Sequence, residues 1–349
     1  MPKLSAWAKK HLSLRPSPKK CPKDALPVLP SPRRPITPVS FATAACLLFQ
    51  LPWDIRSMIL SIAFGGSTLH MDLARQDEAW QWRGLVCYQY DYGSQLPSPL
   101  DPWSSPHVWN DACLQYERQR KFPKDNVGIM GFLLSCKQAY TEGIDFLYSA
   151  NCINIQSEIL LLNLPRLIPT NRLTSMTSLQ IVIRAHWIEQ GNEGPFLNLG
   201  HLRPILDNII THCHSLRSFC LAFLGASDKY GRKYEILHGP ALPMLDAFYR
   251  SKRLRDMRVE LPAEAFKQVN TWKSIDHPRE APAKEWNKRS LWRCLDGEEP
   301  TVQYRSHERY PHPPLRLPLQ DGEDDTVESD GYWFREGDEG PVRQYVDCF

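Results

Sequence analysis

The stretch LPWDIRSMILSIAFGG, residues 51–66, carries the start and stop signals of a helix. Pro52 suits a first helical position, because the N–H that proline lacks would find no partner there, and Asp54 favours the positive end of the helix dipole. The glycines at 65–66 supply a left-handed stop. Four apolar residues recur with helical spacing and form one stripe: Ile55, Met58, Ile59 and Ile62. The stretch therefore predicts an amphipathic helix of about three turns that begins near Leu51.

A second stretch, GFLLSCKQAYTEGIDFLYSANCINI at residues 131–155, has the same helical period. Five positions keep the spacing of one helix face: Leu133, Cys136, Tyr140, Ile144 and Leu147. Asn151 breaks this period, and the alternation in residues 152–155 indicates a short strand. We therefore expect two helices that are far apart in the sequence to pack side by side, the second of which leads into a sheet.

Residues 157–262 alternate helix patterns with strand patterns. Strands are predicted at 179–183, 216–224 and 254–261, and helices at 202–213 and 242–249. The strand centres near Ile181, Phe219 and Met257 lie about 38 residues apart. Two architectures fit this spacing. One is a set of irregular units, since HCHSLRSFCLAFL resembles a cysteine-containing leucine-rich repeat, and the other is an α/β layer with a largely parallel sheet.

The flanks of this region differ from it in composition. Residues 1–40 hold nine Lys or Arg against Asp24 alone, with nine of the 30 prolines, and are predicted to be a disordered basic tail. Residues 263–330 lose periodicity and are predicted to be a flexible polar and acidic linker. Residues 331–349 recover alternation, so that 332–335 and 342–346 predict a hairpin that returns to the sheet.

A resemblance to a known family rests on the succession of LPWDIRSMIL, FGGSTLHMDL, WQWRGLVC, GFLLSCKQAYTEGIDFLYSANCINI, LLNLPRL and SLQIVI. Over residues 47–261 the chain is similar to an uncharacterised, F-box-like fungal family that is known only as a domain of unknown function. The resemblance implies an α+β or α/β fold. An F-box-like helical module at 41–156, with a strand-containing insertion at 67–128, would pack on the helix–strand region 157–262. An ordinary F-box has its helices almost consecutive, and the insertion departs from that pattern.

The F-box resemblance also implies a partner. F-box modules contact a Skp1-type subunit of a ubiquitin ligase and carry a protein substrate, so this chain is expected to be a non-enzymatic interaction protein. Five residues are the candidates for that contact: Leu51, Pro52, Ile55, Met58 and Ile59. The alternative for all five is burial within the protein's own core, which the insertion could help to form.

Chemical motifs point to no enzyme class. The sequence has no glycine-rich phosphate loop after a strand, no GxSxG elbow, no HExxH and no CxxC pair, so no catalytic residue and no cofactor are predicted. The densest group of potential metal ligands is His212, Cys213, His214 and Cys220. Adjacent residues on a helix point about 100° apart and do not easily share one tetrahedral ion, so no metal is predicted. Glu142 and Asp145 are interpreted as a solvated helix face rather than an acid and base pair. An uncharted enzyme remains one alternative.

Charge and hydropathy argue against a nucleic-acid-binding, a membrane or a secreted protein. The net charge is +3, but the first 40 residues carry +8, which leaves −5 for the rest and does not favour nucleic-acid binding. Four aromatic residues alternate near Arg83 and are interpreted as packing residues: Trp80, Trp82, Tyr88 and Tyr90. No apolar stretch approaches the roughly 20 residues that span a bilayer, and no secretory signal is predicted. Ten scattered cysteines, among them Cys46, Cys136 and Cys220, are interpreted as reduced core thiols. A cytoplasmic or nuclear protein is expected.

Overall fold

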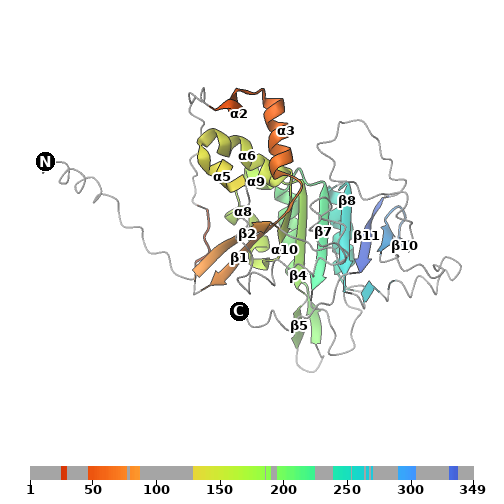
Figure 1. Ribbon diagram of the computed structural model, residues 1–349. Helices are drawn as coiled ribbons and strands as arrows, with labels where there is room; N and C mark the ends of the chain where they lie inside the picture. Colours follow the sequence, from red (N-terminus) through yellow and green to blue (C-terminus); the bar gives the residue numbers. More distant parts are fainter. Residues whose placement is uncertain are drawn as a thin grey trace, which may run out of the picture.

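The computed structural model describes residues 25–29, 46–76, 79–86, 129–184, 186–189, 195–224, 239–252, 254–262, 265–266, 269, 290–303 and 330–336. These residues form a mixed α/β fold that is built on a nine-stranded sheet (Figure 1). A cluster of helices from the N-terminal half lies beyond one end of the strands, at the top of Figure 1. Within the described ranges, no helix is both long enough and apolar enough to cross a membrane.

The sheet has the strand order β10-β9-β11-β8-β7-β4-β3-β1-β2. The strands are β1 (Thr68–Gln76), β2 (Ala79–Val86), β3 (Cys152–Ile155), β4 (Ser178–Arg184), β7 (Ser218–Leu224), β8 (Asp256–Leu261), β9 (Ser290–Cys294), β10 (Thr301–Gln303) and β11 (Gly331–Glu336). The six central strands, β1, β3, β4, β7, β8 and β11, each run parallel to their neighbours within this set. The outer strands β2, β9 and β10 are antiparallel to the strands beside them. The last strand of the described residues, β11, is thus an interior strand between β8 and β9.

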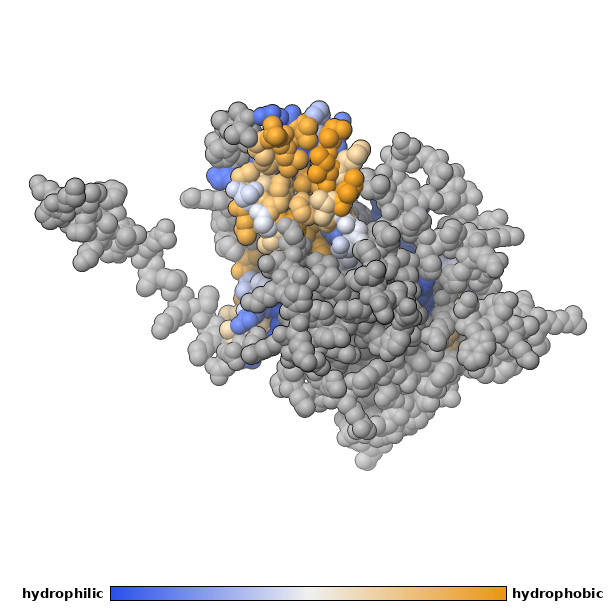
Figure 2. Space-filling view, viewed as in Figure 1, coloured by the Kyte–Doolittle hydropathy of each residue, from blue (hydrophilic) through white to orange (hydrophobic). Residues whose placement is uncertain are grey.

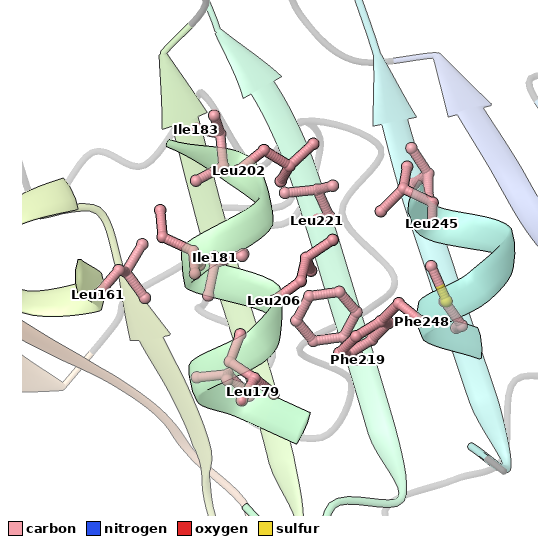
Figure 3. Close-up of a cluster of buried hydrophobic side chains, with 14 of the residues drawn as sticks. Leu161, Leu179, Ile181, Ile183, Leu202, Leu206, Phe219, Leu221, Leu245 and Phe248 are labelled. Carbon is pink, nitrogen blue, oxygen red and sulfur yellow. The ribbon is translucent and has the colours of Figure 1, made fainter. Parts of the chain in front are cut away.

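Helices connect the parallel strands and cover one face of the sheet. They are α7 (Glu158–Leu162), α8 (Leu164–Leu167) and α9 (Thr170–Ser175) before β4, α10 (Leu202–His212) before β7, and α12 (Ala241–Lys252) before β8. A separate pair, β5 (His186–Glu189) and β6 (Pro195–Asn198), precedes α10. Because strand side chains alternate, every second residue faces the helices. Figure 3 shows the resulting core, where Ile181 and Leu221 lie under Leu206. In the same core the ring centres of Phe219 and Phe248 are 4.7 Å apart.

The N-terminal helices are α2 (Leu47–Gln50), α3 (Trp53–Phe64), α5 (Ile129–Ser135) and α6 (Lys137–Ser149). A single helix was expected through Cys136, and this expectation is wrong. The backbone of Cys136 is extended, and its Sγ accepts a hydrogen bond from the Ala139 N–H at 3.3 Å, so that Cys136 caps a new helix. The chain folds back there, and α5 packs closely on α6. A Cβ atom on Gly143 would lie 2.8 Å from the Phe132 ring and 2.9 Å from the Leu133 side chain, so a larger residue would have to displace these side chains.

Most strands and helices agree with the expected positions, and the mixed α/β class is confirmed. The predicted insertion at 67–128 does contain strands, but β1 is not separate from the main sheet, because it pairs in parallel with β3. On β2, Trp80 packs against the core, whereas Trp82 is exposed. Residues 88 and 90 lie outside the described residues. The leucine-rich-repeat interpretation stays a prediction.

Two segments of the flanks differ from the sequence-based boundaries, whereas a third, residues 331–336, contains the strand expected at 332–335. Within the predicted tail, Leu26 packs against the core and the Leu29 N–H donates to the Arg166 carbonyl at 3.0 Å, so 25–29 are ordered by contact with α8. Within the predicted linker, residues 290–303 form β9 and β10. Residues 331–336 form β11, which pairs with β8 and β9. Residues 342–346, the expected second strand of the hairpin, lie outside the described residues.

Candidate functional site

The helix α3 has the ends that its sequence predicts. It begins at Trp53 with Pro52 as the preceding cap residue, and the Ser57 hydroxyl donates to the Asp54 carbonyl at 2.8 Å. At the other end the φ angle of Gly66 is 76°, in the left-handed region where glycine is strongly preferred. The start near residue 51 and the stop at 65–66 are therefore predicted to within two residues.

One side of α3 packs on α5 and α6. Leu60 is 1% exposed, and the rings of Phe64 and Phe132 are 5.7 Å apart. Nearer the start of the helix, the rings of Trp53 and Phe146 are 6.1 Å apart. The two helical stretches of the sequence thus lie side by side, although more than sixty residues separate them in the chain.

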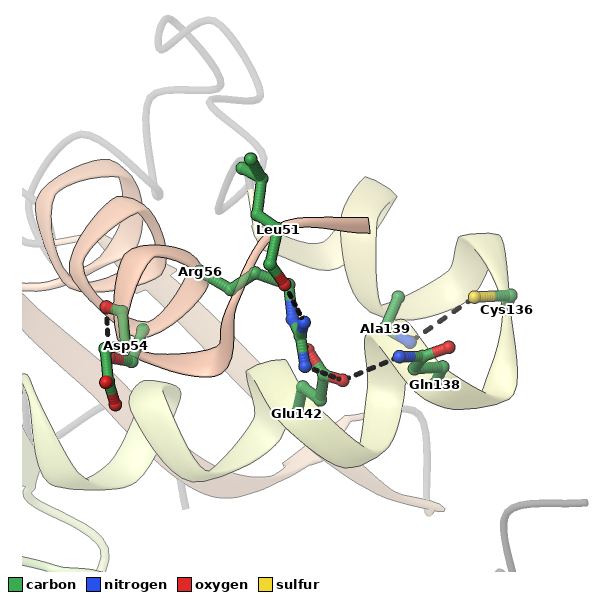
Figure 4. A network of polar contacts seen from close by, with 8 residues as sticks. Leu51, Asp54, Arg56, Cys136, Gln138, Ala139 and Glu142 are labelled. Atoms are coloured by element: carbon green, nitrogen blue, oxygen red, sulfur yellow. Dashed lines mark hydrogen bonds and ion pairs between the residues drawn. The ribbon is translucent and has the colours of Figure 1, made fainter. Parts of the chain in front are cut away.

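Arg56 links α3 to α6 on this packed side of the helix (Figure 4). Its Nε and Nη2 donate to the two carboxylate oxygens of Glu142 on α6, at 2.9 and 3.0 Å, and both side chains are 14% exposed. Its Nη1 donates to the Leu51 carbonyl, and its guanidinium lies 5.4 Å from the centre of the Trp53 ring. A largely buried bidentate pair of this kind is geometrically specific. Arg56 therefore fixes the turn between α2 and α3. Sequence reasoning missed this role, although opposite charges on two helices expected to pack were a usable signal.

The predicted apolar stripe lies on the opposite side of α3. Its residues are exposed to 44% at Ile55, 57% at Met58, 39% at Ile59 and 66% at Ile62. Leu51 and Pro52 are exposed as well. Figure 2 shows apolar side chains gathered over this end of the molecule. The stripe is therefore not buried by the described residues, whereas residues 87–128 of the insertion, which the alternative of core burial invoked, lie outside them.

Asn151 joins the helices to the sheet. Its Nδ2 donates to the carbonyls of Phe64, Phe146 and Leu147, at 2.8, 3.3 and 3.2 Å, and its Oδ1 accepts from the Ser67 N–H at 3.0 Å. The side chain thus binds the last turns of both α3 and α6 and the residue before β1. It is 2% exposed. Sequence analysis identified Asn151 only as the residue where the helical spacing ends. Its role in joining the helices to the sheet was missed because its partners Phe64 and Ser67 are distant in the chain.

One protein family matches residues 41–279, which is more than half of the chain. The chain belongs to the DUF7730 family. This family is described as a domain of unknown function. No curated protein and no solved structure matches the chain. Membership of an uncharacterised family is therefore confirmed, whereas the F-box-like relationship and the fungal source stay predictions.

In this DUF7730 protein the potential metal ligands lie apart. Cys213 follows α10 and is part of the core beneath the helices, whereas Cys220 lies on β7 and points to the other face of the sheet, where its Sγ is 3.9 Å from an oxygen of Glu260. Across the described part of the chain, no group of three His, Cys, Asp or Glu side chains is placed to hold a metal ion.

Glu142 and Asp145 face different partners. Glu142 is held by Arg56 and by the Gln138 amide, whose Nε2 donates at 2.8 Å. The Asp145 carboxylate pairs with Arg172 of α9 and is 60% exposed. The two carboxylates therefore do not share a cleft as an acid and base pair would.

The described cysteines are of two kinds. Cys46 and Cys136 are exposed, so their interpretation as core thiols is wrong. Cys152, Cys213, Cys220 and Cys294 are buried. Burial raises the pKa of Cys152 to about 11 and that of Cys213 to about 12, so these two thiols stay protonated near neutral pH.

The sheet face opposite α10 and α12 carries buried polar residues. They are His70, Asn154, Gln180, Arg258, Glu260 and Arg335, each at most 9% exposed. Nδ1 of the His70 ring is 3.0 Å from the Asn154 Oδ1, and the Asn154 Nδ2 donates to the Gln180 Oε1 at 2.9 Å. Burial raises the pKa of Glu260 from 4.5 to about 8, although Arg335 and Arg258 oppose the change. At neutral pH this carboxyl is mainly protonated.

This carboxyl makes the stability depend on pH. The folded state holds a proton on Glu260 that the unfolded chain releases above about pH 4.5, so the free energy of unfolding should fall as the pH rises from about 4.5 to about 8. The change is roughly 1.4 kcal/mol per pKa unit. Glu260→Gln should remove this loss, which urea unfolding at pH 5 and pH 8 measures. The exposed Glu298 supplies a control, Glu298→Gln. Equal pH dependence of wild type and Glu260→Gln would contradict the assignment.

Proposed function

We propose that this DUF7730 protein is a non-enzymatic, F-box-like adaptor that docks a Skp1-type ubiquitin-ligase subunit on the outward side of α3. The supporting observation is the exposure of the α3 stripe although the other side of the same helix is already packed. A surface helix normally shows one apolar stripe, and that stripe faces its own core. A second apolar face that is left in solvent marks an interaction site. The five residues proposed for the contact, Leu51, Pro52, Ile55, Met58 and Ile59, are all exposed.

The long segment between the two helical stretches is compatible with this proposal. In an ordinary F-box the helices follow one another closely, whereas here residues 67–128 intervene. The ion pair between Arg56 and Glu142 nevertheless joins α3 to α6, and Phe64 packs on Phe132 of α5. A partner would therefore meet a packed group of helices, as it would if they were consecutive.

We further propose that the helix–strand units of residues 157–262 are leucine-rich-repeat-like and carry the protein substrate. Support comes from the order of β3, β4, β7 and β8, which are neighbours in the sheet in the same sequence as in the chain. A helix precedes each of the last three strands on the same face. Repeat proteins stack units in this way and use the resulting extended surface for binding. An adaptor of this kind would act in the cytoplasm or the nucleus.

Ile55→Asp is expected to abolish co-purification with a Skp1-type subunit and to weaken its affinity at least tenfold, because a charge would be buried at the contact. Ile55 is 44% exposed, so the melting temperature should change little. Leu162→Asp is the matched control, since Leu162 is 37% exposed on α7, away from the docking helix. Calorimetric titration with the purified subunit measures the effect. Failure of the wild-type chain to bind would refute the proposal.

A further inference from the structure

The strand β2 forms one edge of the nine-stranded sheet, and β10 forms the other. Edge strands present unpaired backbone N–H and C=O groups, so proteins commonly make them short, charged, bulged or interrupted by proline. The edge at β10 is protected in this way, because that strand has only three residues. By contrast β2 has eight residues, no proline and a single charge, at Arg83. Figure 1 shows the hairpin of β1 and β2 at this edge of the sheet.

The ladder between β1 and β2 is uninterrupted, and the middle of β2 is exposed. Residues 79–86 pair one to one with β1, so no bulge disturbs the edge. Residues 81–84 are all exposed. Beyond His70, β1 has β2 as its only strand neighbour among the described residues, because the pairing with β3 ends there. A ribbon of two strands is marginally stable on its own, so further pairing at β2 would stabilise this part of the sheet.

One face of β2 continues the apolar layer of the sheet. Residues directly opposite each other in an antiparallel pair share a face, so Trp82 lies on the same face as its partner Leu73, a core residue. Trp80 and Gly84 share this face, because strand side chains alternate. Trp80 packs against the core, whereas Trp82 is 44% exposed. A strand added beside β2 would cover the exposed side of the Trp82 ring.

The conformation of β2 does not require the glycine at position 84. A Cβ atom on Gly84 would meet the His70 carbonyl oxygen at 3.6 Å, which is an ordinary contact distance, and its φ angle is not in the left-handed region. Glycine within a strand weakens it, but glycine also marks places where another chain approaches closely. An aromatic side chain on a neighbouring strand can compensate for a glycine near a sheet edge. Gly84 is therefore suited to accept a ring from an added strand.

We infer that β2 pairs antiparallel with β2 of a second copy of the chain, with Trp82 of both copies at the two-fold axis. Trp80 of each copy then lies opposite Gly84 of the other, and Gln81 lies opposite Arg83. The strand supplies both the aromatic ring and the glycine, so it is complementary to itself, as a two-fold symmetric interface requires. The α3 stripe takes no part, so this inference is independent of the proposed function.

The neighbouring registers fit less well. A two-fold axis perpendicular to the sheet passes beside a single residue of each copy, which keeps the apolar faces of the two copies on the same side. An axis at Arg83 would place two arginines directly opposite each other, which is destabilising. An axis at Gln81 would leave Gly84 outside the paired residues. The axis at Trp82 avoids both faults.

Trp82→Lys tests the pairing. It places two positive charges directly opposite each other, so the dissociation constant of the dimer should rise at least tenfold, as measured by sedimentation of the full chain over a concentration series. Leu134→Lys is the control and should stay within twofold of wild type. Leu134 is 78% exposed on α5, which belongs to the helices beyond the strand ends in Figure 1. Thermal unfolding checks that each variant folds.

Cysteine variants test the register. Residues directly opposite in an antiparallel pair have Cα atoms about 4.5–5.5 Å apart, a distance that a disulfide spans. Under mild oxidation, Gln81→Cys chains mixed with Arg83→Cys chains should therefore cross-link faster than either variant alone. The wild-type chain gives the background from its own cysteines. Faster cross-linking of Arg83→Cys alone would place the axis at residue 83 and overturn the register.

Two further outcomes would overturn the pairing itself. A wild-type chain that stays monomeric up to about 100 μM, well above the micromolar constants of weak specific complexes, has no such dimer, and the β2 edge would then be left to a strand of another protein. A wild-type dimer that Ile55→Asp dissociates and Trp82→Lys does not would place the interface on α3. Neither outcome depends on whether the Skp1-type subunit binds.

Discussion

A chain that stops after Asp330 is expected to lose most of its stability and its cooperative thermal transition. The removed segment contains β11, which pairs with β8 on one side and with β9 on the other. Tyr332 and Phe334 are fully buried, and truncation of one such aromatic side chain costs about 3–5 kcal/mol. Loss of both is comparable with the roughly 5–15 kcal/mol that stabilises a whole domain. Circular dichroism during heating measures the loss.

The same truncation would disrupt a buried polar group. Asp246 of α12 accepts two hydrogen bonds from Arg293, at 2.8 and 2.7 Å, and one from the Tyr332 hydroxyl at 2.8 Å. Without β11, the Asp246–Arg293 pair loses the tyrosine that completes it.

A chain that stops after Glu336 is the matched control for this truncation. It retains the whole of β11, so its melting temperature should lie within a few degrees of wild type. A point variant, Phe334→Ala, should fall between the two truncations, with about 3–5 kcal/mol lost in urea unfolding. Wild-type melting of the chain that stops after Asp330 would show that β11 is not an interior strand.

Asn151→Ala is expected to lower the free energy of unfolding by about 3–5 kcal/mol. The substitution removes the partner of the Ser67 N–H and of the Phe64 carbonyl, and each buried polar group left without a partner costs about 1–3 kcal/mol. The contacts to Phe146 and Leu147 on α6 are lost as well. Urea unfolding followed by tryptophan fluorescence gives the change in free energy.

Asn163→Ala separates this effect from the ordinary loss of an asparagine. Asn163 also ends a helix and donates to a carbonyl, that of Ile159 at 2.9 Å, but it is only half-buried and its partners are local. Its substitution should cost less than about 1 kcal/mol. Equal destabilisation by the two variants would mean that Asn151 acts only as a helix end.

Elements with a local signature were the ones that sequence analysis located. Residues 152–155 alternate in a way that only a strand explains, and they form β3 with those bounds. The helix over 53–64 has its proline and its glycines at the two ends. The break at Cys136 was missed because the apolar spacing continues across it, and a cysteine is an uncommon helix cap. The short strands β9 and β10 were missed because pairing with neighbouring strands, rather than their own pattern, stabilises them: β9 pairs with β11, and β10 pairs with β9.

Sequence analysis located the apolar stripe of α3, but it did not show whether the stripe is exposed. An apolar stripe at Ile55 and Ile59 has the same pattern whether it faces a core or a partner. The decision depended on which side of α3 meets α6, and that is set by Arg56 and Glu142 across 86 residues of chain.

The link between α3 and β1 has a mechanical consequence. Only residues 65–67 separate the two elements. Asn151 forms hydrogen bonds on both sides of this link, with the Phe64 carbonyl and the Ser67 N–H, so the helices have little freedom to rotate relative to the sheet. A partner bound to α3 would therefore keep a fixed orientation relative to the strands. If the chain binds two other molecules, it acts as a rigid connection between them. Any change in the distance between those molecules must then come from their own flexibility.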